Sequence, residues 1–235
     1  MNIFSYFCVI DNTMSILLRG YNWVRRFRHR CGYGVHSPSD FAFITNVVYE
    51  KLPYYAYTHL HQLRRVTPPL PHHREKTDKF FFRMVNFLQP CRILEWGTGS
   101  GLSTIYLSTG CKQCKVVTID EALDPKVEKI LSRYANITCR SGKYSPEELL
   151  DDAPMPLVHI AHTPHYAEIF ESLLPHVDDN SCVVVSYPYL DKEKEKWWKS
   201  VINDERTGIT FDLYDVGIVF FNKNRIKEHR IVNFL

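Results

Sequence analysis

The sequence lacks an uninterrupted apolar run near the length of about 20 residues that a membrane-spanning helix requires. Its apolar first ten residues have no basic residue before them and no small-residue cleavage site after them, so we expect neither a signal peptide nor a membrane span. There is also little excess charge, because 29 basic and 26 acidic residues leave a net charge of +3. This near balance does not indicate nucleic-acid binding.

The seven cysteines are odd in number and scattered along the chain, with three in or beside predicted strands. This favours reduced, partly buried thiols in a cytoplasmic protein over a disulfide framework. Cys111 and Cys114 form one close pair, and without a second pair nearby they do not indicate a zinc or redox site. A chain of 235 residues that is 45% hydrophobic can bury one substantial core.

Glycine is scarce, with ten residues in all, yet three of them fall at Gly97, Gly99 and Gly101. An apolar run over 92–96 precedes them and a run with helical spacing over 102–107 follows, which predicts a strand, a glycine turn and a helix. Glycines allow the backbone to turn tightly and to approach a ligand that the N–H groups of the new helix face. The next predicted strand ends at Asp120, where a nucleotide-binding βαβ unit places the carboxylate that accepts ribose hydroxyls.

After Asp120 the predicted strands and helices alternate, and two strand-like runs over 209–214 and 217–221 close the chain as an antiparallel hairpin. This order predicts an α/β, Rossmann-like fold with a mostly parallel seven-stranded sheet, a C-terminal antiparallel hairpin and N-terminal helices. In such a sheet the ligand lies at the carboxyl ends of the strands.

The N-terminal part is predicted to be separate from this sheet. We expect residues 1–75 to form a helical cap and a linker, and residues 76–235 to form the ligand-binding domain. The linker over 64–74 is rich in proline, and His72 and His73 within it are expected to be solvated. A second methionine, Met14, leads to the hypothesis that residues 1–13 are a start-site extension, which an intact mass including Met1 would end.

Four arginines gather ahead of this linker, at positions 25, 26, 28 and 30. We interpret them as a solvated helix face, with contact to a membrane surface or to RNA as the alternatives.

Several motifs resemble the class I S-adenosylmethionine-dependent methyltransferases, and the catechol-O-methyltransferase-like branch in particular. They are the stretch from Glu95 to Gly101 (EWGTGSG), the run ending at Asp120 (VTID) and the closing hairpin. The segment Gly-Val-His-Ser-Pro at 34–38 is similar to one in a group of uncharacterised bacterial proteins of that class. The resemblance runs from about residue 32 to the C-terminus and implies a Rossmann-like methyltransferase fold with S-adenosylmethionine as cofactor.

The resemblance also implies a set of cofactor-binding residues: Glu95, Gly97, Thr98, Gly99, Gly101, Ser103, Asp120, Gly142 and Lys143. In the family, the glycine turn lines the methionine and ribose part, and a serine at the position of Ser103 helps to hold the carboxylate. Asp120 would bind both ribose hydroxyls, while Gly142 and Lys143 lie where the family contacts adenine. For Glu95 the alternative is a carboxylate that caps nearby backbone amides.

Two strand ends depart from the family pattern. The fourth strand usually ends in an aspartate, which is replaced here by Ala161, and the acids that end the fifth strand are replaced by Ser186 and Tyr187. In the metal-dependent branch those acids hold a divalent cation, and a hard cation needs oxygen ligands. The sequence therefore predicts a metal-independent protein with no metal ligands.

Three histidines, His159, His162 and His165, stand near the end of the fourth predicted strand. His162 or His165 could serve as a general base, because imidazole titrates near neutrality. The alternatives are a soft-metal site made by the three imidazoles, or side chains that only fill loop positions.

The expected function is methylation of a small-molecule acceptor at oxygen or nitrogen. The alternative is a degenerate methyltransferase fold that binds the cofactor or a protein partner without catalysis. A nucleic-acid methyltransferase is disfavoured, since no Asn/Asp-Pro-Pro-Tyr type motif follows the fourth strand. The sequence leaves a homodimer open.

Overall fold

A computed structural model describes residues 16–144, 148–149 and 157–235 of the chain. The proposed start-site extension, residues 1–13, lies outside these described residues. The strands are β1 (Arg92–Trp96), β2 (Lys115–Asp120), β3 (Ile137–Ser141), β4 (Leu157–Ile160), β5 (Cys182–Ser186), β6 (Thr210–Asp212), β7 (Val216–Phe220) and β8 (His229–Ile231). The α-helices are α2 (Ile16–Arg25), α3 (Pro38–Phe43), α4 (Ala56–Val66), α5 (Glu75–Leu88), α6 (Leu102–Gly110), α7 (Pro125–Leu131), α8 (Tyr166–Leu173) and α9 (Lys192–Asn203). Shorter helices are the 3₁₀-helices η1 (Phe27–His29) and η4 (Leu174–His176) and the π-helix η2 (Ile44–Val48).

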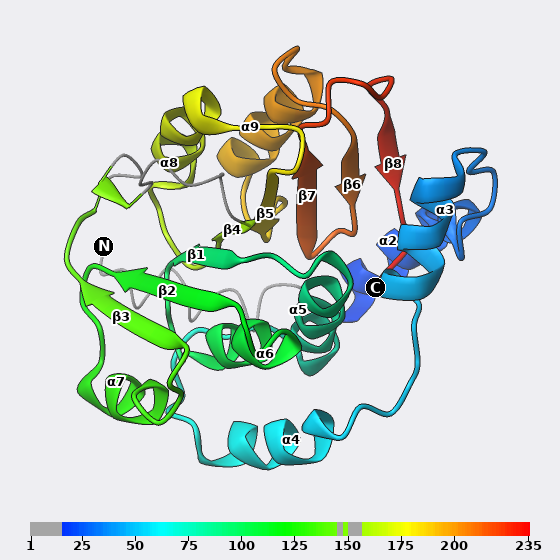
Figure 1. The fold of residues 1–235 in the computed structure, drawn as a ribbon. Coiled ribbons are helices and arrows are strands. Elements are labelled where there is room, and N and C mark those ends of the chain that lie inside the picture. The colour runs from blue at the N-terminus through cyan, green and yellow to red at the C-terminus, as the bar shows by residue number, and fades with distance from the viewer. Residues whose placement is uncertain (1–15, 145–147, 150–156) are drawn as a thin grey trace.

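The strands form one sheet in the order β3-β2-β1-β4-β5-β7-β6-β8 (Figure 1). Strands β1 to β5 run parallel to one another, whereas β7 runs antiparallel to both β5 and β6. The predicted α/β class, the mostly parallel sheet and the C-terminal hairpin are therefore confirmed. The predicted number of strands was one too low, because β8 adds a short edge strand parallel to β6.

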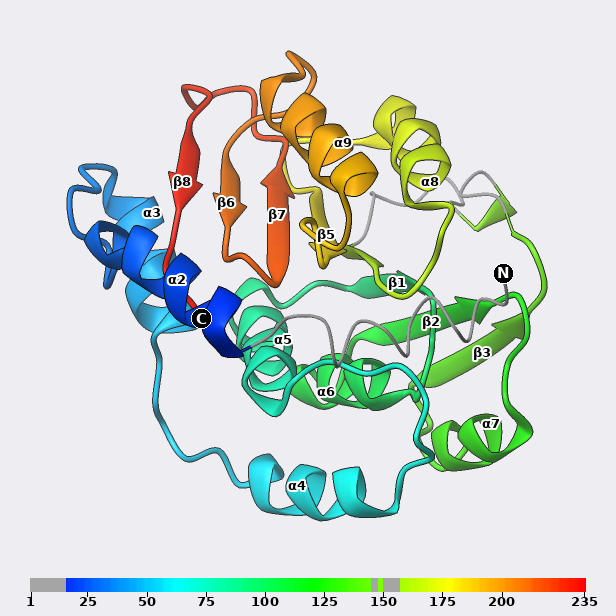
Figure 2. The same ribbon diagram turned by 180° about the vertical axis from the view of Figure 1, so that it is seen from behind.

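Helices cover both faces of the sheet, with α5, α6 and α7 on one side and α8 and α9 on the other (Figures 1 and 2). Side chains alternate along each strand, so Ile93 packs against Phe80 and Phe81 of α5 while its neighbour Leu94 packs with the α8 and α9 side. A third apolar cluster joins α4 to the outer surface of α6 and α7. Alternation thus divides the strand residues between two cores.

The first two N-terminal helices, α2 and α3, pack at the end of the sheet that contains the closing hairpin. Phe43 of α3 contacts Phe211 and Phe220 of the closing hairpin, with ring centroids 4.9 and 5.6 Å apart. Helix α2 lies beside the C-terminal end of the chain in both ribbon views (Figures 1 and 2).

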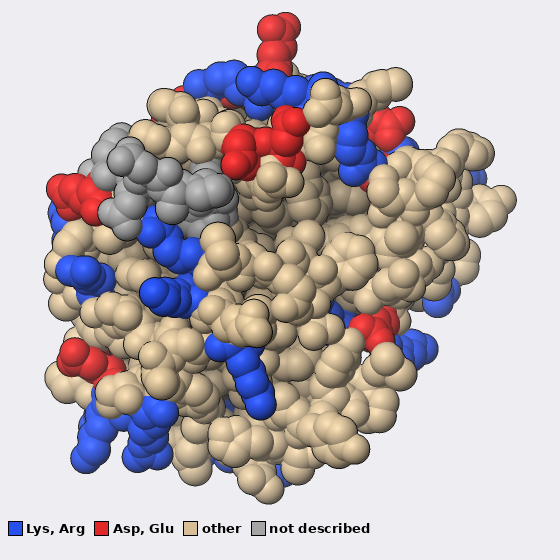
Figure 3. Space-filling model, in the orientation of Figure 1, with Lys and Arg blue, Asp and Glu red and all other residues tan. Residues whose placement is uncertain are grey.

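The surface drawn in Figure 3 carries acidic and basic side chains interspersed, without a continuous field of one sign. Within the described residues, no helix combines the length and the apolar character needed to cross a membrane. Six of the cysteines lie within the described residues, and all six are free thiols.

A close contact between β7 and α9 gives a test of the packing. A Cβ atom on Gly217 would lie 2.5 Å from the ring of Trp198, which is fully buried. We expect Gly217→Ala to lower the free energy of unfolding by about 1–3 kcal/mol, because the indole has no free space to move into. Urea denaturation measures the change. The control is Gly20→Ala, where a Cβ meets nothing within 4 Å; equal stability of the two variants would contradict the packing.

Candidate functional site

The glycine turn after β1 adopts backbone conformations that favour glycine. Gly97, Gly99 and Gly101 have φ angles of 91°, 54° and 76°. A Cβ on Gly97 would lie 2.5 Å from the backbone of His162, and one on Gly99 would lie 2.5 Å from the carbonyl oxygen of Pro71. The turn is therefore clamped between the segment after β4 and the proline-rich segment before α5.

Asp120 ends β2 directly beside this turn. Its Oδ2 accepts a hydrogen bond from the Gly99 N–H and its Oδ1 accepts one from the Ala122 N–H, both at 3.2 Å. Each carboxylate oxygen has a second acceptor site. The side chain is half-buried and lines a cavity, so it can accept further hydrogen bonds from a bound hydroxyl group.

That cavity has a volume of about 500 Å³ and lies at the carboxyl ends of β1 to β4. Its lining residues are Trp96, Gly97, Ile119, Asp120, Glu121, Gly142, Lys143, Tyr144, Glu148, His162, Thr163, Pro164, His165, Glu168, Ile169 and Ser172. Apolar walls come from Trp96, Ile119 and Ile169, and the carboxylates outnumber the basic side chains. Among the described residues, none from the N-terminal range 16–75 lines this cavity.

The predicted histidines occupy three different environments. His162 and His165 line the cavity, whereas His159 is buried outside it. Burial lowers the pKa of His162 to about 3, so its imidazole is neutral at physiological pH and a weak proton acceptor. His165 is partly exposed and lies between Glu121 and Glu168, with N–O distances of 3.0 and 3.3 Å.

Glu95 points into the interior on the other face of β1 and does not line the cavity. Its carboxylate accepts hydrogen bonds from the hydroxyls of Ser103 (2.7 Å), Thr118 (2.9 Å) and Thr104. It also lies 2.9 Å from Nδ1 of His159, and all of these side chains are buried. The alternative of a carboxylate that caps backbone amides is not what the structure shows, since its partners are side chains.

Of the nine predicted cofactor-binding residues, the structure brings Gly97, Asp120, Gly142 and Lys143 together around the cavity. Thr98 is buried and its hydroxyl lies 2.8 Å from that of Thr118. Gly99, Gly101 and Ser103 are not among the lining residues. Gly99 donates to Asp120, Gly101 lies against the side chains of α7, and Ser103 donates to Glu95.

The interior also holds functional groups that the sequence reasoning did not find. His73 was expected to be solvated, but it is completely buried, with Nε2 at 2.6 Å from Oγ of Ser186. Nε2 of His159 lies 2.8 Å from the same Oγ. Because the Glu95 carboxylate can only accept, His159 donates to it from Nδ1, and the Ser186 hydroxyl bridges Nε2 of His159 and Nε2 of His73. The serine thus joins two histidines in one buried chain of hydrogen bonds.

The strand ends that carry acids in the metal-dependent family present other groups here. Ala161 is buried, and Ser186 is engaged by the two histidines. In the part of the chain that the structure describes, no three His, Cys, Asp or Glu side chains are arranged to hold a metal ion.

Several solved structures with a similar architecture are methyltransferases. A methyltransferase of Podospora anserina in its SAH-bound form has a TM-score of 0.57 and 14% identity, over 80% of this chain and 96% of that one. A putative caffeoyl-CoA O-methyltransferase of Staphylococcus aureus has a TM-score of 0.58 and 15% identity, over 72% and 93%. The O-methyltransferase TomG of Streptomyces achromogenes, solved with SAM, has a TM-score of 0.55 and 18% identity, over 78% and 96%.

These likenesses establish the fold: the chain has the Rossmann-like fold of class I methyltransferases. No family model and no curated protein matches the sequence.

The buried Lys194, which is hydrogen-bonded to Ser186, gives a prediction of how the stability of the protein depends on pH. Nζ of Lys194 donates to the carbonyl oxygen of Ser186 at 2.8 Å, and burial lowers the pKa of this lysine from 10.5 to about 7. Between these two values the unfolded chain holds a proton that the folded chain does not, so the contribution of Lys194 to stability rises with pH. Lys194→Met removes this dependence.

We therefore expect the stability of Lys194→Met, relative to the unmodified protein, to be highest below pH 7 and to fall as the pH rises toward 10. Urea titrations over this pH range measure the difference. Lys196→Met, an exposed position on the same helix, is the matched control. A stability difference that does not vary with pH would show that Lys194 keeps its charge throughout.

Proposed function

We propose that the chain binds S-adenosylmethionine in the cavity at the ends of β1 to β4 and methylates a small-molecule acceptor at oxygen or nitrogen. The observation that carries this proposal is the placement of Asp120. Its carboxylate ends β2, contacts the glycine turn and faces a cavity large enough for a nucleoside. Ribose hydroxyls donate well to a carboxylate at this position of an α/β sheet.

The charges around the cavity support a cationic cofactor. Asp120, Glu121, Glu148 and Glu168 contribute four carboxylates, whereas the basic lining side chains are Lys143 and the histidines. S-adenosylmethionine carries a sulfonium and an ammonium against one carboxylate, so this field favours it. The pyrophosphate of a dinucleotide would be repelled, because like charges in a shared site raise the free energy of binding.

The residues fit the adenosine half of the cofactor in particular. Trp96, Ile119 and Ile169 provide apolar surface for the adenine ring, with Gly142 and Lys143 at its edge. The methionine half would extend from Asp120 toward Gly97 and the segment before α5. In that direction Pro71 accepts a hydrogen bond from the Ser100 N–H at 3.0 Å.

The bound cofactor would supply an activated methyl group, so the chain needs only to hold the acceptor in line with it and to exclude water. His162 lies between the glycine turn and the buried His73. Its neutral imidazole can accept a hydrogen bond from the hydroxyl or amine that is to be methylated. His165, held by two glutamates at the rim, is the other side chain placed to take a proton. We propose that neither methyl transfer nor removal of the acceptor's proton uses a metal ion, because Ala161 and Ser186 replace the acids at the strand ends.

A second candidate function, binding without methyl transfer, is favoured by one observation. The only imidazole buried against the glycine turn, among the described residues that line the cavity, is that of His162, whose pKa of about 3 makes it a poor base. A protein of this kind would bind the cofactor or its product with normal affinity and show no turnover. Incubation with labelled cofactor and a panel of phenols, catechols and amines distinguishes the two functions.

Asp120 provides the test of the binding site. We expect Asp120→Asn to weaken the binding of S-adenosylmethionine and S-adenosylhomocysteine by roughly tenfold, because the ribose loses charge-assisted hydrogen bonds while the amide oxygen still accepts from Gly99. Isothermal titration calorimetry measures both ligands. Asp124→Asn, which keeps the N-cap of α7 and lies outside the cavity, is the matched control. Unchanged affinity in Asp120→Asn, or no binding by the folded protein, would refute the proposal.

A further inference from the structure

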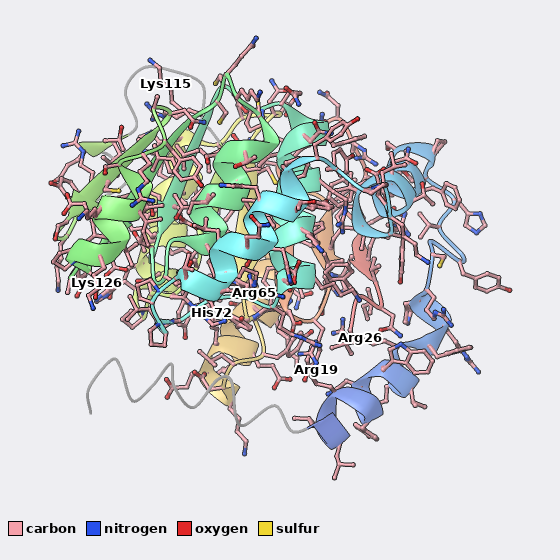
Figure 4. The ribbon with its side chains drawn as sticks, turned by 90° about the horizontal axis from the view of Figure 1, so that it is seen from below. Arg19, Arg26, Arg65, His72, Lys115 and Lys126 are labelled. Atoms are coloured by element: carbon pink, nitrogen blue, oxygen red, sulfur yellow. The ribbon has the colours of Figure 1, made fainter. Side chains whose placement is uncertain are left out.

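Helix α2 is attached to the domain through its polar side chains. The guanidinium of Arg19 donates to both carboxylate oxygens of Asp215 at 2.8 Å, and Arg26 donates to Oδ1 of Asp212 at 2.9 Å. Between them, Asn22 donates to the hydroxyl of Tyr214 at 2.9 Å. Figure 4 shows Arg19 and Arg26 pointing from α2 toward the body of the domain. The spacing of these three residues places them on one face of the helix.

The opposite face of α2 is apolar and exposed to solvent. Leu17, Tyr21 and Val24 are 83%, 59% and 65% exposed, and Phe27 of η1 continues the row at 52%. A surface helix of a globular protein normally turns its apolar face inward and its charges outward. Here the ion pairs with Asp212 and Asp215 hold the helix in the reverse orientation. We call Leu17, Tyr21, Val24 and Phe27 the outer face of α2.

Basic side chains border this outer face. Arg25, Arg28, His29 and Arg30 are all exposed, and residues 16–39 contain no Asp or Glu. Arg25 stacks over the ring of Tyr21 and Arg30 over that of Phe27, with guanidinium-to-centroid distances of 5.7 and 5.3 Å. Directly after α2, Arg28 and His29 join His229 and Arg230 in lining a second cavity of about 330 Å³. Of these four, Arg230 already pairs with Asp40 and Glu228.

We propose that the outer face of α2 and the arginines that follow it bind the surface of a lipid bilayer that contains anionic lipids. An exposed apolar row with aromatic side chains, bordered by arginines and lacking acids, has the composition of a helix that lies in the interfacial plane of a membrane. The apolar side chains enter the boundary between headgroups and acyl chains, while the guanidinium groups contact lipid phosphates.

A second copy of the chain fits this face less well. A symmetric contact through α2 would bring two basic segments together without any acidic residue from 16–39 to compensate. Like charges placed opposite one another across an interface oppose association. An anionic surface removes this repulsion and replaces it with attraction.

The experiment is sedimentation of the full chain with vesicles of phosphatidylcholine alone or with about one third phosphatidylserine, at low and high salt. We expect binding to the anionic vesicles at least about tenfold tighter than to the neutral ones, and weaker binding at high salt because screening reduces the attraction. The variant Leu17→Ser/Val24→Ser should lose at least about tenfold in affinity. Its matched control is Leu52→Ser/Val66→Ser, which changes two equally exposed apolar side chains elsewhere, 63% and 73% exposed.

A second pair of variants tests the charges: Arg25→Gln/Arg28→Gln is compared with Arg65→Gln/Arg133→Gln, which changes two exposed arginines outside α2 and the arginine-rich segment that follows it. Only the first pair should reduce the binding and its salt dependence. Absence of binding to anionic vesicles, or equal losses in the control variants, would overturn the proposal. A dimer that Leu17→Ser/Val24→Ser dissociates, without vesicle binding, would assign the outer face to a contact between copies instead. Titration of the same variants with S-adenosylmethionine tests the proposed methyltransferase function separately, so a failure of either proposal can be told from a failure of the other.

Discussion

The buried carboxylate of Glu95 is the interaction on which the architecture of the strand ends depends. Its two oxygens receive hydrogen bonds from α6 and β2 and lie against His159 of β4, so one side chain ties three elements to β1. An ionised carboxylate without such partners would be strongly destabilising in this interior. The hydroxyl donors at 103, 104 and 118 therefore stabilise the buried carboxylate and, through it, the fold.

From Glu95 the polar network continues across the sheet. His159 is hydrogen-bonded to Ser186 of β5, and Ser186 is hydrogen-bonded to His73 in the segment before α5. His73 stacks on Tyr187, and the carbonyl of His73 accepts from Arg64 of α4. The glycine turn, the proline-rich segment and the end of β5 are thereby held in fixed relation. The cavity lies on the opposite side of β1, where Trp96 and Asp120 remain available to a ligand.

Much of this fold could be predicted from the sequence because its signals are local. The apolar run, the glycine turn and the restart of helical spacing around residue 97 each follow from neighbouring residues, and so does the acid that ends β2. The cavity position of Asp120 follows from topology alone. In contrast, β8 has three residues and no alternation, so its pairing with β6 depends on contacts made elsewhere in the chain.

The remaining surprises involve polar residues whose partners are distant in sequence. Strand alternation alone places Glu95 and Trp96 on opposite faces, but only the partners of Glu95 tell which face is the interior. His73 looked like a solvated residue because it lies among prolines, and its burial depends on Ser186, 113 positions later. Arg26 looked like part of a solvated basic face, and it is instead paired with Asp212.

The docking of α2 has a consequence for the order of assembly. Arg19 and Arg26 leave the ribosome well before their acceptors, which follow 196 and 186 positions later, in the turn before β7 and in strand β6. Contacts of such long sequence separation form late, because the intervening chain must be ordered first. During synthesis helix α2 therefore has no docking site until the hairpin of β6 and β7 has formed, so the hairpin decides where this much earlier helix is placed.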